Sequence, residues 1–99
     1  MPVRLVITTY ARPGQGTALA QAMAERCRAV QQEPGCQQFE VFQSALDPDK
    51  LVVLELWADQ AALDIHAQVN ASQPPNPLLA DLRADATRPR EDYTYNRTR

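Results

Sequence analysis

The segment 51–57 is apolar at every position except Glu55, and it constrains the fold more than any other part of the chain. Successive side chains of a β-strand point to opposite faces of a sheet. Apolar residues therefore occupy both faces, with Leu51, Val53 and Trp57 on one and Val52, Leu54 and Leu56 on the other. One layer of helices covers only one face, so we expect a second subunit to cover the other.

The residues at the start of the chain predict a strand followed by a helix. Residues 3–10 are rich in β-branched and aromatic types and end before the turn signal Pro13-Gly14. Apolar residues then recur at spacings of three and four over residues 16–32, which predicts an amphipathic helix. Pro34-Gly35 ends that helix, because proline cannot continue the hydrogen-bond ladder and glycine permits a tight exit.

A β-hairpin and a second helix follow. Residues 36–45 partly alternate between apolar and polar, and the turn residues at 47–50 connect them to the strand 51–57. Residues 59–70 carry apolar side chains along one side of a helix, and Asp59 is placed to cap its N-terminus.

The last third of the chain predicts a loop, a short helix and a final strand. Residues 72–77 contain three prolines, and a short apolar helix comes next, with Leu78, Leu79 and Leu82. Residues 86–96 predict a strand, weakened at its start by Pro89. The order β-α-β-β-α-β is the ferredoxin-like pattern, so we expect one α+β domain over residues 1–99 with an antiparallel sheet.

Charge and hydropathy exclude two classes of partner. The chain of 99 residues has a formal net charge of −2, and no basic stripe of the kind that nucleic-acid phosphates require. The apolar run at the N-terminus turns polar at Thr8-Thr9, too soon for a signal peptide or a membrane span. We therefore expect a cytoplasmic protein without nucleic-acid or membrane partners, in which Cys27 and Cys36 stay reduced.

Several short motifs together resemble the antibiotic biosynthesis monooxygenase (ABM) domain over residues 3–70. They are Pro13-Gly14, Glu33-Pro34-Gly35-Cys36 with Phe39, and Glu55-Leu56-Trp57-Ala58-Asp59-Gln60-Ala61-Ala62-Leu63 through His66. The resemblance implies a homodimer, a dimeric α/β barrel in which the two sheets meet, with an apolar pocket between the sheet and the helices of each protomer. Some members of this family oxygenate quinols, anthrones or other polycyclic phenols with molecular oxygen and need no flavin, haem or metal.

No cofactor is expected. The sequence has no GxGxxG motif, no P-loop lysine motif and no cluster of histidine, cysteine and carboxylate residues with metal-ligand spacing. Haem-degrading relatives use an asparagine on the first strand and a tryptophan on the second helix. Here the first strand has Thr8 and Thr9, and His66 falls at the tryptophan position, so haem cleavage is not expected.

His66 is the only histidine and the first candidate for a catalytic residue. Its unperturbed pKa of about 6.5 makes it the ordinary side chain that can act as a general base at neutral pH. The alternative is a half-buried structural histidine that orders the loop after its helix.

Glu55 and Trp57 are candidates for substrate contact. A carboxylate inside an apolar strand is costly unless it has a partner, so Glu55 should either pair with an arginine such as Arg4 or Arg90 or have a raised pKa. A structural ion pair is the preferred interpretation. For Trp57, packing in the core or an interface is preferred over a stacking contact with an aromatic ligand.

Four further residues could line a pocket. Phe39 lies on the first arm of the hairpin, Tyr93 and Tyr95 share one face of the last strand, and Asn96 could orient a phenolate by hydrogen bonding. Ordinary sheet packing is the simpler explanation for the aromatic residues, and solvent exposure for Asn96.

Three functions remain open at this point. The first is a cofactor-independent monooxygenase that acts on a small aromatic molecule and molecular oxygen, with His66 as base. The second is an isomerase or tautomerase that acts on a small carbonyl compound with the same base and pocket. The third is a non-catalytic dimer that binds a small aromatic metabolite.

Overall fold

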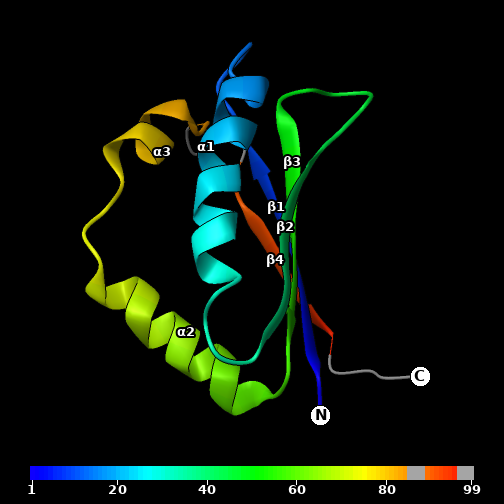
Figure 1. Cartoon of the computed structure of the whole chain (residues 1–99). Coiled ribbons are helices and arrows are strands. Elements are labelled where there is room, and N and C mark those ends of the chain that lie inside the picture. Colours follow the sequence, from blue (N-terminus) through cyan, green and yellow to red (C-terminus); the bar gives the residue numbers. More distant parts are fainter. Residues whose placement is uncertain (85–88, 96–99) are drawn as a thin grey trace.

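The computed structural model describes residues 1–84 and 89–95, and it forms one antiparallel sheet covered by helices on one side (Figure 1). The strands are β1 (Val3–Tyr10), β2 (Cys36–Gln43), β3 (Lys50–Trp57) and β4 (Glu91–Tyr95), and the helices are α1 (Gly16–Val30), α2 (Gln60–Ser72) and α3 (Pro77–Leu82). The strand order is β2-β3-β1-β4. This arrangement confirms the predicted α+β, ferredoxin-like fold.

The two faces of the sheet differ in cover, as the alternation in β3 predicts. The face toward the helices carries the core, in which Leu51, Trp57 and Leu19 of α1 are completely buried. On the other face Leu54 is only half-buried, and Phe42 exposes about half of its surface. All three helices lie on the same side of the sheet in Figure 1, so nothing within the described chain covers the second face.

The predicted element boundaries differ from the structure mainly at the last strand. The predicted strand over 86–96 starts only at Glu91, because Pro89 and Arg90 precede β4 without strand pairing; residues 85–88 and 96 lie outside the described part. Proline has no N–H to donate to a sheet, which accounts for the late start. The first helix ends at Val30 rather than at residue 32, with Gln31 as its C-cap.

Side-chain caps fix the N-termini of the two helices that follow β3. Asp59 is the N-cap of α2, and its side chain accepts a hydrogen bond from the backbone N–H of Ala62 at 2.8 Å, as predicted. Asn76 caps α3 in the same way, with Pro77 at the first helical position. Within the described residues, no helix is long and apolar enough to cross a membrane.

Gly35 is the point where the chain leaving α1 passes closest to α2. Its φ angle is +81°, and a Cβ atom there would lie 2.5 Å from the Cβ of Ala62. Gly14 has nearly the same φ, +79°, but open space where a Cβ would be. The two glycines thus separate the cost of a left-handed backbone from the cost of a clash with α2.

We expect Gly35→Ala to lower the free energy of unfolding more than Gly14→Ala does. The left-handed backbone alone should cost about 1–2 kcal/mol in each variant. The clash with Ala62 should add about 1–3 kcal/mol in the first variant only. Urea unfolding of both variants and the wild type measures the difference, and equal losses would show that α2 moves away from Gly35 without cost.

Candidate active site

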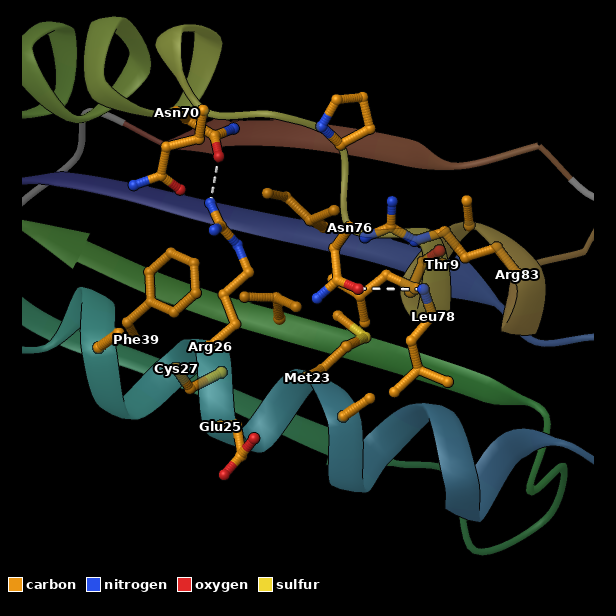
Figure 2. A pocket seen from close by; sticks show the side chains of 18 of the residues that line it. Thr9, Met23, Glu25, Arg26, Cys27, Phe39, Asn70, Asn76, Leu78 and Arg83 are labelled. Atoms are coloured by element: carbon orange, nitrogen blue, oxygen red, sulfur yellow. Dashed lines mark hydrogen bonds between the residues drawn. The ribbon is translucent and has the colours of Figure 1, made fainter.

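A cavity of about 790 Å³ lies between the helix-covered face of the sheet, α1 and the connection from α2 to α3 (Figure 2). Its floor is formed by sheet residues, one wall by α1, and its roof by the proline-containing connection. The lining includes Thr9, Phe39 and Glu55 of the sheet, Arg26 of α1, His66 and Asn70 of α2, Asn76 before α3, and Arg83 and Arg90. The volume is in the range of sites that hold a drug-sized ligand.

His66 is buried at one end of this cavity, and its ring is held on three sides. Its Nδ1 lies 2.9 Å from Oε1 of Glu33, a residue of the turn between α1 and β2. The ring stacks on Trp57 with centroids 4.7 Å apart and meets the edge of Phe39 at 5.7 Å. An ionised carboxylate can only accept, so Nδ1 donates to Glu33, and in the neutral imidazole Nε2 is then the nitrogen that can act as a base.

Glu55 lies beside this histidine and is also buried, with 4% of its surface exposed. Its Oε1 accepts a hydrogen bond from Trp57 Nε1 at 2.8 Å. Burial raises the pKa of Glu55, while the Trp57 hydrogen bond and the nearby His66 and Arg90 act in the opposite direction. The cavity thus contains a carboxyl group that holds its proton to a higher pH than an exposed glutamate does.

The predicted ion pair between Glu55 and an arginine is wrong for the described residues. Arg4 Nη1 donates to the side chain of Gln38 and, at 3.5 Å, to the backbone oxygen of Glu55 rather than to its carboxylate. Arg90 instead pairs with Asp92, at 2.7 and 3.0 Å. The predicted raised pKa is present.

We name Glu33, Phe39, Glu55, Trp57 and His66 the acid–base cluster. It unites a loop, two neighbouring strands and α2 at one end of the cavity. It offers an imidazole nitrogen able to take a proton and a carboxyl group able to give one. A site with this pair can move protons on a bound molecule.

The predicted site residues divide into those that the structure gathers and those that it does not. His66, Phe39 and Glu55 line the cavity, while Trp57 is fully buried behind His66. Tyr93 pairs with Val6 on the uncovered face of the sheet, away from the cavity. Tyr95 pairs with Arg4 in the sheet register, and Asn96 lies outside the described residues.

The sequence interpretation missed Arg26, Arg83, Asn70 and Asn76 as cavity residues. Arg26 donates to the side chain of Asn70, and Arg83 lies just after α3, beside the end of β1. No spacing rule connects these positions, because the cavity brings together segments far apart in the chain. In residues 1–84 and 89–95, no group of three or more histidine, cysteine and carboxylate side chains is placed to hold a metal ion.

Comparisons with known proteins point to one family. The family model described as antibiotic biosynthesis monooxygenase matches residues 2–73. A conserved protein from Methanosarcina mazei Go1 has a similar structure, with a TM-score of 0.80, 22% identity and coverage of 99% of this chain and 94% of that chain. The crystal structure of an antibiotic biosynthesis monooxygenase is also similar, with a TM-score of 0.78, 22% identity and coverage of 98% of this chain and 99% of that chain. Among curated proteins, none matches the chain.

We expect Glu55→Gln to change how stability depends on pH. In the wild type the folded-state pKa is raised, so the contribution of Glu55 to stability is fully present below its ordinary pKa of about 4.3 and is lost as pH rises through the folded value. Glutamine stays neutral and keeps an oxygen for Trp57 Nε1. The variant should therefore gain stability relative to the wild type between pH 4 and pH 8.

Urea unfolding across that pH range measures this difference. Glu25→Gln is the matched control, because Glu25 is an exposed glutamate of α1 and lies away from the uncovered face of the sheet. Its unfolding curve should follow the wild type at every pH. A constant difference between Glu55→Gln and the wild type would mean that Glu55 is not destabilised in its charged form.

Proposed function

The chain belongs to the antibiotic biosynthesis monooxygenase family, and we propose that it is a cofactor-independent monooxygenase that oxidises a quinol, an anthrone or a similar polycyclic phenol with molecular oxygen. The observation that carries this proposal is the pair His66–Glu33 at the end of a cavity that is large enough for fused rings. The carboxylate of Glu33 holds the proton on Nδ1, which leaves Nε2 as a base for the substrate.

The reaction needs no external reductant, because the substrate supplies all the electrons. His66 Nε2 takes a proton from a quinol hydroxyl or from the acidic carbon of an anthrone, and the resulting anion passes one electron to molecular oxygen. The two radicals combine to form a C–O bond, and the hydroperoxide then loses water. A quinol plus O₂ gives a hydroxyquinone plus H₂O, and an anthrone CH₂ plus O₂ gives C=O plus H₂O.

Glu55 supports the second half of this sequence. Burial raises its pKa, and when Glu55 is protonated it can donate to the hydroperoxide oxygen that leaves as water. The aromatic rings around His66 exclude water from the anion and the radical pair, which limits side reactions. Acid and base thus act on the same end of the bound substrate.

The same acid and base also support the isomerase alternative. A base that removes a proton from carbon and a neutral acid that gives one to oxygen are sufficient to tautomerise a carbonyl compound, and oxygen is not consumed. The non-catalytic binder differs from both enzymes, because its ligand would be released unchanged.

The uncovered face of the sheet supports the proposed homodimer. Val52, Leu54 and Leu56 are half-buried there, and Phe42 and Tyr93 are about half exposed. A small domain gains substantial apolar burial when a second copy covers such a face. We place the dimer contact on this face, opposite the cavity.

We expect purified protein to consume oxygen with a panel of quinols and anthrones, and His66→Ala to lower the rate at least 100-fold because the general base is lost. Glu33→Gln should also lower it, by up to about 10⁴-fold, because the amide can donate to Nδ1 and so leave the ring proton on Nε2. Gln68→Ala, an exposed change on the same helix, is the control and should keep the wild-type rate. Uptake no faster than autoxidation would contradict the monooxygenase, and substrate consumed without oxygen would favour the isomerase.

We expect the chain to be a dimer in size-exclusion chromatography with light scattering, and Leu54→Lys to shift it toward the monomer by placing a charge on the uncovered face. Leu46→Lys is the control, because Leu46 is 98% exposed in the hairpin turn. A monomeric wild type, or a dimer that Leu54→Lys leaves intact, would contradict this placement of the contact.

A further inference from the structure

Arg83 is held at the opposite end of the cavity from the acid–base cluster by its backbone. It forms an antiparallel bridge with Ala11, just beyond β1. Arg12 N–H donates to the oxygen of Leu82 at 2.9 Å, and Ala84 N–H donates to the oxygen of Tyr10 at 2.8 Å. These contacts on both sides of Arg83 fix where its side chain starts.

The side chain of Arg83 lines the cavity with a polar group that lacks a partner. Its Nε is buried, and the residues that the structure describes offer it no hydrogen-bond acceptor. A buried donor without an acceptor costs about 1–3 kcal/mol, and more when the group is charged. The buried Nε itself is out of a ligand's reach, so a molecule in the cavity would contact the terminal Nη atoms of Arg83.

Three arginines line the cavity: Arg26 bonded to Asn70, Arg90 near Glu55, and Arg83 at the end of α3. Figure 2 shows Arg26 and Arg83 reaching over the cavity from α1 and from the end of α3. Burial lowers the pKa of Arg83, and the positive charges of Arg90 and Arg26 lower it further. Arg26 is bonded to a neutral amide, whereas Arg90 is already paired with Asp92, so no described carboxylate neutralises Arg83 or Arg26.

We propose that the ligand of this cavity is an aromatic carboxylate, and that the terminal Nη atoms of Arg83 bind its carboxyl group. The two Nη atoms of a guanidinium match the two oxygens of a carboxylate, whose charge offsets that of the arginines lining the cavity. This inference rests on the proposed function for the reaction at the other end of the ligand. It adds the substrate class, namely phenols or quinols that carry an acid group.

The geometry also sets where the carboxylate lies on the ligand. Glu55 pairs with Leu5 in the sheet, and Arg83 bridges to Ala11, which is six residues further along the chain. At about 3.3 Å per residue, Leu5 and Ala11 are roughly 20 Å apart along the strand. The Arg83 side chain covers part of that distance, so the acid group lies at the end of a fused-ring ligand remote from the reacting carbon.

Binding of 6-hydroxy-2-naphthoate tests the proposal, because its hydroxyl and carboxylate lie at opposite ends of two fused rings. The comparison ligand is its methyl ester, which keeps the rings and the hydroxyl but not the charge. Isothermal titration calorimetry in the absence of any oxidation should show the acid binding to the wild type at least 10-fold more tightly than the ester. Equal affinities, or no binding of the acid at millimolar concentration, would overturn the proposal.

Two variants assign the preference to Arg83. Arg83→Gln should bring the affinity for the acid to within threefold of that for the ester and leave the affinity for the ester unchanged. Arg28→Gln, which removes an exposed charge on α1, is the control and should keep the preference for the acid. If Arg83→Gln does not fold, Arg83→Lys keeps the charge without the fork and should weaken the acid 3- to 10-fold. An acid affinity equal to that of the wild type in the Arg83 variant that folds would overturn the assignment.

These measurements are independent of the oxygen-uptake assay. An Arg83-dependent preference without oxygen uptake would reject the monooxygenase and keep the carboxylate site. Oxygen uptake with neutral quinols, but no preference for the acid, would keep the monooxygenase and reject the carboxylate site.

Discussion

The stacking of His66 on Trp57 is the interaction on which the cavity depends. His66 is the only fully buried residue of α2, and the apolar contacts that accompany it are the partly buried Ala62 and Leu63 rather than a row of buried leucines. An amphipathic helix packed by leucine or valine would lie close to the strands and fill the space beside α1. Here α2 stays at the edge of the sheet, and the space between α1 and the α2–α3 connection remains open.

Trp57 also explains why a carboxyl group is tolerated in an apolar strand. Glu55 and Trp57 lie two residues apart on β3, so their side chains share a face, and the indole N–H donates to the carboxyl oxygen. Trp57 thus contacts the base through its ring face and the acid through its ring nitrogen. One fully buried tryptophan fixes the positions of both proton-transfer groups.

The fold follows from the sequence to a greater extent than the site does. Runs of β-branched, aromatic and other apolar residues were enough to predict β1 and β3, and the three-and-four spacing was enough for α1. Asp59 caps α2 as expected, because these signals are local. The pairing of His66 with Glu33 joins residues 33 positions apart, which no local pattern reveals. The partner of Glu55 is the indole N–H of Trp57, two residues away on the same strand, and not the arginine that was predicted. Arg83 carries no local signal at all, since only the bridge to Ala11 brings it to the cavity.

The position of Arg83 has a consequence for how the family can diversify. The match to the family model ends at residue 73 and includes Glu33, Glu55 and His66, whereas Asn76, Arg83 and Arg90 come after it. The proposed reactive groups and the proposed ligand-binding group thus lie in successive stretches of one chain that meet only in space. Changes after residue 73 can alter what enters the cavity without touching the groups that move protons. Two members can therefore share a reaction and differ in substrate, and membership of the family does not by itself name the molecule that is oxidised.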